Sequence, residues 1–107
     1  MARKIPLRTV QIANGFDRPV NFSYAETLTH ILAFAQPGQG LTMDEVLRAT
    51  DAMAPLKRAI DEGAEYVTFS EEQYKVLTEK LNIFPFAIAT SEIADFGLAV
   101  RNAPEIT

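Results

Sequence analysis

The residues that could carry out chemistry in this chain are few. The 107-residue sequence has one histidine and no cysteine, which excludes disulfides, thiolate nucleophiles and any site that needs two histidines. His30 lies four residues after Glu26, so on a helix the two side chains share a face and could form half of a metal site. The same spacing is typical of a surface histidine paired with a carboxylate, which is the interpretation we favour.

Adjacent carboxylates are the second candidates for chemistry. Asp44-Glu45 and Glu71-Glu72 stand in the first turns of expected helices, where negative charge complements the helix dipole and completes caps. We therefore assign them to helix capping rather than to acid–base catalysis. Glu92 and Asp95 interrupt an apolar segment at a spacing that makes them neighbours on one side of a helix. Buried together they would be a candidate enzyme site, whereas a solvated strip, which we favour, would have no such role.

A glycine-rich turn is the remaining motif with a chemical counterpart. Gly38-Gln39-Gly40 precedes a helical pattern, but it lacks the Lys-Ser/Thr of a phosphate-binding loop and the third glycine of a dinucleotide fingerprint. We interpret it as a turn between two helices. Because no group of residues matches a catalytic constellation, we predict no enzymatic activity, no catalytic residues, no cofactor and no metal site.

Charge is distributed unevenly along the chain, which has a net charge of −4. The charged residues among the first 18 are basic except for Asp17, and all the charged residues of 61–72 are acidic. The two segments could attract each other between copies of the chain in a head-to-tail contact, or they could lie side by side in one fold and neutralise each other. The candidate interaction residues on this basis are Arg3, Lys4, Arg8 and Arg18 with Asp61, Glu62, Glu65, Glu71 and Glu72.

The elements that position these residues begin with an extended arm over residues 1–22. Lys4 to Ile12 shows partial alternation of apolar residues, and Asn14-Gly15 is a strong turn signal. Pro19 to Phe22 would complete a β-hairpin. A lone hairpin is marginally stable in water, so it must pack on helices or pair with another strand. Residues 65–69 (Glu-Tyr-Val-Thr-Phe) could supply that third strand or an extended connector.

Residues 23–103 are expected to form a compact bundle of about four helices, so we predict an α+β, mostly α fold with a single domain over 1–107. Three helix starts are marked by a capping pattern, a Ser or Thr followed three residues later by Glu or Gln. The capping residues are Ser23, Thr42 and Ser70, and their partners are Glu26, Glu45 and Gln73.

The second and last helices each contain a proline that bears on their bounds. Pro55 interrupts a continuous amphipathic face, so we expect a kink or a break there. Pro85 suits the first turn of the last helix, which is the most apolar and is expected to run through the middle of the core. The face that crosses Pro55 is predicted to bury Val46, Leu47, Thr50, Met53, Leu56 and Ile60.

This order of elements resembles small, uncharacterised proteins of tailed bacteriophages and prophages over roughly residues 24–103. The resemblance implies a phage or prophage origin and a setting in the bacterial cytoplasm or the virion, and it implies no particular activity. The matching stretches are Leu41-Thr42-Met43-Asp44-Glu45, Leu56-Lys57-Arg58-Ala59-Ile60, Phe69-Ser70-Glu71-Glu72 and Phe84-Pro85-Phe86-Ala87-Ile88.

We therefore predict a non-enzymatic protein–protein interaction module, either a virion or assembly component or a small effector that binds a host protein. Its partner would be a second copy of the chain or another phage or host protein. Phe16, Tyr66 and Phe84 fall outside the helical stripes, and aromatic side chains often anchor interfaces.

The alternative is a nucleic-acid-associated regulatory protein that uses the basic N-terminal arm. The second helix, however, begins with Asp44-Glu45, which is the wrong charge to present to a DNA groove. We expect no membrane association, because no apolar run approaches the ~20 residues of a membrane span, and no secretion, because no apolar signal core follows the first residues. No small-molecule substrate is expected, since no catalytic constellation is present.

Overall fold

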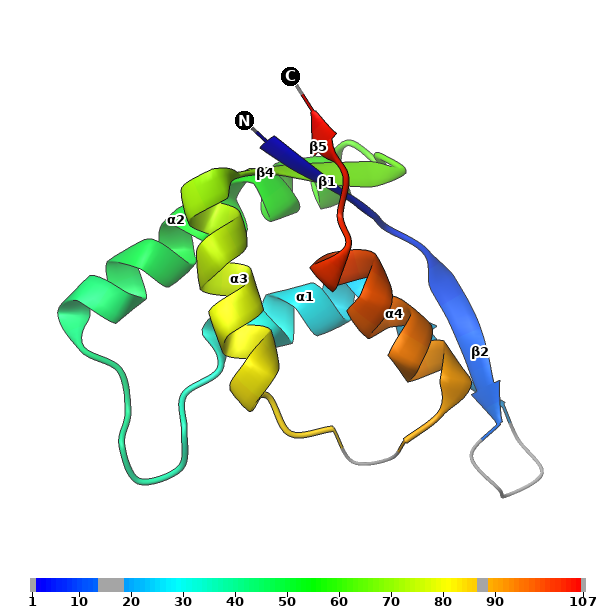
Figure 1. Ribbon diagram of the computed structural model, residues 1–107, viewed down its shortest axis with the longest axis horizontal. Helices are drawn as coiled ribbons and strands as arrows, with labels where there is room; N and C mark the ends of the chain where they lie inside the picture. Colours follow the sequence, from blue (N-terminus) through cyan, green and yellow to red (C-terminus); the bar gives the residue numbers. More distant parts are fainter. Residues whose placement is uncertain (1, 14–18, 87–88, 107) are drawn as a thin grey trace.

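The computed structural model describes residues 2–13, 19–86 and 89–106, and it has the α+β fold expected from the sequence (Figure 1). The turn predicted at Asn14-Gly15 lies outside the described residues, as do Phe16 and Arg18. In chain order the elements are β1 (Ala2–Pro6), β2 (Thr9–Ala13), β3 (Pro19–Ser23), α1 (Tyr24–Ala33), α2 (Met43–Asp61), β4 (Tyr66–Ser70), α3 (Glu71–Ile83), α4 (Ser91–Arg101) and β5 (Glu105–Ile106).

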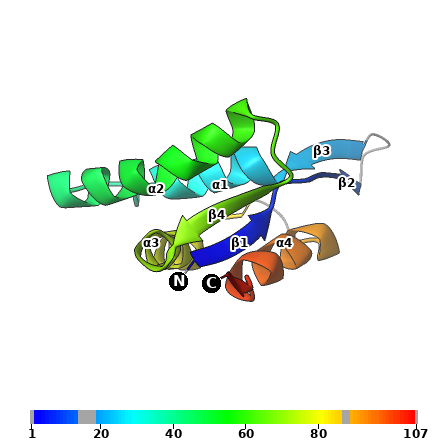
Figure 2. The same ribbon diagram turned by 90° about the horizontal axis from the view of Figure 1, so that it is seen from above.

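The strands form two antiparallel sheets. A three-stranded sheet has the order β4-β1-β5, and β2 and β3 form a separate hairpin. Ile5 pairs with Val67, and both side chains are buried on the sheet face that packs on the helices. In Figure 1 this sheet lies along the upper edge of the molecule, where both termini meet. Figure 2 shows β4 and β1 crossing the middle of the molecule, with α1 and α2 toward one side and α3 and α4 toward the other.

The N-terminal pairing differs from the prediction in one respect. The extended segment that begins at Lys4 does not continue to Ile12 as one hairpin strand, because the chain leaves the ladder at Leu7 and Arg8. The Leu7 N–H still donates to the Glu65 carbonyl at 2.8 Å, whereas the Arg8 carbonyl accepts from the Tyr24 N–H at 2.9 Å. The first part therefore pairs with β4 and β5, and only the second part forms the hairpin. The third strand suggested at 65–69 is confirmed as β4.

Helix α1 lies at the centre of the core, which corrects the expectation that the last helix runs through it. Leu28, Ile31 and Leu32 of α1 are fully buried, whereas α4 buries only Phe96 and Val100 among its described residues. The ring of Tyr24 packs edge-on against Phe96 at 4.9 Å between centroids, and burial raises the pKa of the Tyr24 hydroxyl.

The last helix also begins later than predicted. Pro85 does not open it, because the chain from Phe84 to Phe86 is irregular and α4 begins at Ser91. The hydroxyl of Thr90 accepts from the Ile93 N–H at 3.2 Å, so this threonine supplies the N-cap. A cap that satisfies a free N–H fixes the start of a helix more strongly than the φ preference of a proline alone.

The three predicted capping residues all act as N-caps. The hydroxyl of Ser23 accepts from the Glu26 N–H at 3.2 Å. Thr42 with Glu45, and Ser70 with Gln73, form complete capping boxes in which each side chain satisfies the other's backbone N–H. The Thr42 N–H and hydroxyl donate to the Glu45 carboxylate and lower the pKa of that carboxyl group.

Helix α2 runs through Pro55 without a break, and a side chain of α3 donates to the backbone carbonyl that the proline leaves without a donor. Proline has no N–H, so the carbonyl of Asp51, four residues earlier, lacks its intrahelical donor. The side-chain amide of Gln73 donates to that carbonyl at 3.1 Å. The same side chain accepts from the Ser70 N–H at 2.9 Å, so it completes the α3 cap and repairs α2 together.

The buried face of α2 is not the one that the larger apolar residues indicate. Leu47 and Ile60, which were expected to be buried, are exposed, and Leu56 is the one large side chain that the helix buries. Small side chains let a helix approach its neighbours closely, so α2 packs against α1 and α3 through alanines. The buried alanines are Ala49, Ala52 and Ala59.

Candidate interaction surfaces

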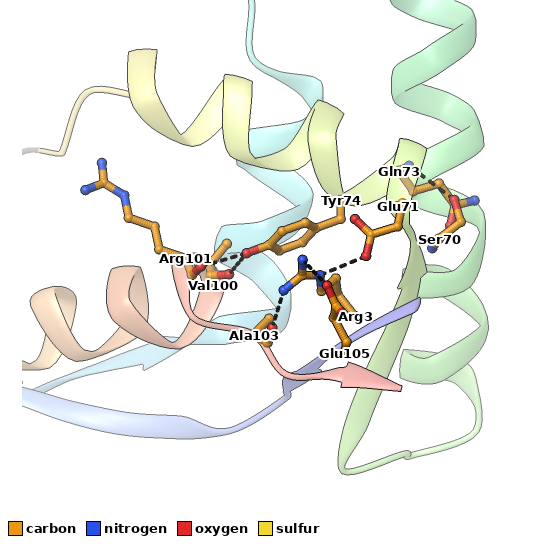
Figure 3. Close-up of polar contacts among 9 residues, drawn as sticks. All are labelled: Arg3, Ser70, Glu71, Gln73, Tyr74, Val100, Arg101, Ala103 and Glu105. Carbon is orange, nitrogen blue, oxygen red and sulfur yellow. Dashed lines mark hydrogen bonds and ion pairs between the residues drawn. The ribbon is translucent and has the colours of Figure 1, made fainter. Parts of the chain in front are cut away.

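Arg3 is the centre of a polar cluster that ties both ends of the chain to α3 (Figure 3). Its guanidinium donates from Nε to Glu71 Oε1 at 2.9 Å, from Nη2 to Glu105 Oε1 at 2.8 Å and from Nη1 to the Ala103 carbonyl at 2.9 Å. It also lies over the ring of Tyr74, at 4.9 Å from the centroid. The Glu71 hydrogen bond raises the pKa of Arg3.

This cluster bears on the two charge arrangements that the sequence left open. For Arg3 and Glu71, the basic and acidic segments neutralise each other inside one fold. The Tyr74 hydroxyl extends the network to the end of α4, at 2.6 Å from the Val100 carbonyl and 2.9 Å from that of Arg101. Arg3 and Glu71 therefore hold the termini in place and are not free for a partner.

The other predicted charged residues are not brought together. Lys4 lies over the ring of Tyr66, with its ammonium nitrogen 3.9 Å from the ring centroid, and the Arg8 guanidinium lies 5.5 Å from the ring centroid of Tyr24. Tyr66 is 46% exposed, as predicted for an interface aromatic. The remaining acidic residues are exposed and make no ion pair within the described part of the chain; they are Asp61, Glu62, Glu65 and Glu72.

An open apolar groove of about 340 Å³ lies between the β2-β3 hairpin, α1, residues 84–86 and α4. Glu26 and His30 lie on its α1 wall, but no group of three or more histidine, aspartate or glutamate side chains comes together in the described ranges. Glu26 and His30, considered above as half of a metal site, therefore have no third ligand among the described residues. The apolar walls of the groove come from Ile12, Val20, Phe22, Phe84, Pro85, Phe86 and Ile93.

A second apolar groove, of about 430 Å³, lies on the other side of the same segment, between α3 and α4. Phe84 and Phe86 line both grooves. The ring of Phe84 packs edge-on against Phe34 at 5.4 Å and against Phe86 at 5.0 Å. Phe84, expected as an exposed anchor, is therefore half-buried and positioned by its neighbours.

Two features leave this second groove open. Leu98 is 57% exposed at its wall, and Gly97 lies beside it on α4. A Cβ built at Gly97 would meet no atom within 4 Å, so the missing side chain leaves empty space and serves no close helix contact. We call Val20, Phe84, Phe86, Ile93 and Leu98 the Phe84–Phe86 surface.

The remaining candidate sites carry less chemistry. Glu92 is half-buried at the start of α4, where its carboxylate accepts from the Ser91 hydroxyl at 3.3 Å, and Asp95 is exposed. They do not form the buried pair that an acid–base site would need. A cleft of about 360 Å³ between α2 and α3 is lined by charges of both signs from Arg48, Asp51, Glu72, Lys75 and Glu79.

Sequence reasoning missed most of the Phe84–Phe86 surface. Phe86 follows Pro85, which was expected to open the last helix, but α4 begins only at Ser91, and Val20 was expected only as part of the strand from Pro19 to Phe22. The exposure of Leu98 could have been predicted from the sequence, because on a helix it lies outside the apolar face formed by Ile93, Phe96 and Val100.

The helices of the described residues include none that is both long and apolar enough to cross a membrane. Comparison with protein-family models, with curated proteins and with solved structures finds no match to this chain. What defines the molecule is its own geometry, a small α+β fold with two apolar grooves on either side of one phenylalanine-rich segment.

Proposed function

We propose that this chain is a non-enzymatic protein–protein interaction module that binds its partner on the Phe84–Phe86 surface. The observation that carries the proposal is the pair of apolar grooves that share Phe84 and Phe86, with Val20 50% exposed on one side and Leu98 57% exposed on the other. Monomeric proteins rarely leave large contiguous apolar patches in water, and such patches commonly mark interaction sites.

The energetics of this surface suit a protein partner. Covering the exposed half of a leucine or valine contributes roughly 1 kcal/mol each, and aromatic side chains held in place by neighbours lose little entropy on binding. Phe84 is held in this way by its contacts with Phe34 and Phe86. In the phage or prophage setting that the sequence resemblance implies, the partner would be a second copy, a virion component or a host protein.

The alternative role in nucleic-acid binding gains no support from the described side chains. Arg3 is used in internal ion pairs, Arg8 covers Tyr24, and the first turn of α2 presents Asp44 and Glu45. Binding to mixed-sequence DNA at low salt, with a steep salt dependence, would be needed to revive this role.

The proposal is tested with a pair of charge variants, Leu98→Glu on the surface and Lys57→Glu on exposed α2 as the control. Light scattering measures self-association, and affinity capture from bacterial extract measures other partners. We expect wild type and Lys57→Glu to behave alike and Leu98→Glu to lose the association. A monomeric chain whose captured proteins are unchanged by Leu98→Glu would contradict the proposal.

A further inference from the structure

Strand β4 has one edge that no described strand covers. In the sheet order β4-β1-β5 it pairs only with β1. The Leu7 N–H donates to the Glu65 carbonyl, and backbone groups alternate in direction along an antiparallel strand. Val67 and Phe69 therefore direct their N–H and C=O groups toward β1, and Tyr66 and Thr68 direct theirs outward.

The residues of β4 that face the free edge are exposed, although α2 also packs against this strand, and the residues before it are acidic. Tyr66, Thr68 and Ser70 are exposed, and no hydrogen bond in the described part of the chain uses the backbone groups of Tyr66 or Thr68. Glu65 directly precedes the strand, Glu62 lies earlier on the same connection, and Asp61 is the last residue of α2. A strand added here would thus meet unpaired backbone groups flanked by carboxylates.

The acidic flanks disfavour pairing between two copies of β4. Antiparallel pairing centred on Thr68 would bring Glu65 of one copy near the start of α3 of the other, where Glu72 is exposed and makes no ion pair in the described residues, and like charges brought close together repel. Charged residues at strand ends are a common protection against such self-association. The same charges favour a basic strand.

The fold already contains a basic strand on the other edge of β4. Strand β1 carries Arg3 and Lys4; the first makes an ion pair with Glu71 at 2.9 Å, and the second lies over the ring of Tyr66. Tyr66 of β4 and Glu71, the first residue of α3, thus engage a cationic strand on the β1 side, and Glu62 and Glu65 before the strand make no ion pair within the described residues.

We infer that the free edge of β4 binds an extended, lysine- or arginine-bearing segment of the partner protein by strand addition. The inference rests on the proposed interaction function and assigns it a second contact of defined chemistry, with backbone hydrogen bonds for affinity and carboxylates for selectivity. It concerns a different face from the Phe84–Phe86 surface, so the two can be tested apart.

The test uses two synthetic peptides that differ only in charge, Lys-Val-Lys-Val-Thr-Val-Lys and Glu-Val-Glu-Val-Thr-Val-Glu, with amide NMR spectra of the full chain. We expect the basic peptide to bind roughly tenfold more tightly, to weaken with added salt, and to slow hydrogen exchange at the Tyr66 and Thr68 amides. Equal binding of the two peptides, or shifts confined to other residues, would overturn the inference.

Two variants locate the contact. Thr68→Pro removes an outward N–H at an edge where proline is tolerated, and we expect it to abolish peptide binding. If that variant does not fold, the double variant Glu62→Lys, Glu65→Lys serves instead, and it should reverse the preference between the peptides. The double variant Glu72→Lys, Glu79→Lys, at two exposed positions of α3, makes the same change in charge away from the start of β4 and should leave the preference unchanged.

The two proposals fail in different ways. Leu98→Glu should leave peptide binding at β4 intact. If the chain binds the two peptides equally while Leu98→Glu still abolishes partner capture, the β4 inference is wrong and the interaction function stands. If peptide binding persists while Leu98→Glu has no effect on capture, the Phe84–Phe86 surface is not the docking site.

Discussion

The bridge from Gln73 to the α2 backbone predicts a specific energetic coupling with Pro55. Gln73→Ala removes two short hydrogen bonds, one from the Ser70 N–H at 2.9 Å and one to the Asp51 carbonyl at 3.1 Å, and a longer, exposed one to the Asp51 carboxylate at 3.4 Å that we expect to contribute little. At about 1 kcal/mol for each, the variant should lose roughly 2 kcal/mol of unfolding free energy.

The effect of Gln73→Ala should shrink once Pro55 is replaced. Pro55→Ala restores an N–H that can donate to the Asp51 carbonyl, so Gln73→Ala then removes only the cap bond and costs about 1 kcal/mol. The expected coupling energy is therefore about 1 kcal/mol. Pro55→Ala alone should stabilise the chain by about 1–2 kcal/mol, because an interior proline costs about 3 kcal/mol and the Gln73 bridge and the stiffer unfolded chain offset part of that.

Urea unfolding of the wild type, the two single variants and the double variant, followed by far-ultraviolet circular dichroism, measures this coupling. Equal m-values across the four proteins would show that the unfolded states are comparable. A cost of Gln73→Ala that is the same in both backgrounds, to within about 0.3 kcal/mol, would refute the role given to the bridge.

Further predictions concern the caps, the core and the open groove. The lowered pKa of Glu45 means that its cap contributes fully above about pH 5 and is lost as pH falls through the folded-state pKa, so Glu45→Gln should flatten the acid limb of the stability curve. Lys80 is 9% exposed and donates to the Phe34 carbonyl at 2.6 Å, so Lys80→Met should lose about 1–3 kcal/mol in urea unfolding, whereas Lys80→Arg should lose less. Gly97→Ala should raise the unfolding free energy by up to about 1 kcal/mol, since the added methyl meets open space and alanine favours the helix; a loss of stability would contradict the open groove. Arg3→Met should lower Tm by several degrees, and the loss should persist in high salt because three hydrogen bonds are removed with the charge.

The local features of the fold were predictable because they depend on neighbouring residues. Ser23, Thr42 and Ser70 cap their helices as expected, since a hydroxyl and an N–H three residues apart meet in any helix start. The strand near 65–69 was one of two alternatives indicated by its β-branched and aromatic residues, and the structure has it as β4.

The non-local features were not predictable from the same patterns. The pairing of β1 with β4 joins residues that are sixty or more positions apart, and β5 contributes two residues, too few to give a pattern. The buried face of α2 consists largely of alanines because α1 and α3 approach it closely, so the more hydrophobic Leu47 is exposed. Helical periodicity is judged mainly from the positions of large apolar residues, so it does not indicate a face that is buried through small alanines.

The candidate site was predicted only in fragments. Tyr66 and Phe84 were singled out as aromatic residues outside the helical stripes. Tyr66 is exposed on β4, and Phe84 lines both apolar grooves. The grooves themselves arise where the hairpin, α1 and α4 meet around residues 84–86, and no single segment encodes that meeting. Of the charged residues predicted for interaction, Arg3 and Glu71 are used to hold the chain ends together, and the other described ones make no ion pair within the described residues.

The most direct test of the central claim is to place a photo-crosslinking amino acid at position 98 and, in a second protein, at position 57. After irradiation in bacterial cells, mass spectrometry identifies what each position touches. The interaction module described here predicts a defined protein crosslinked from position 98 and none from position 57. Crosslinks of equal yield and the same composition from both positions, or none from position 98, would contradict it.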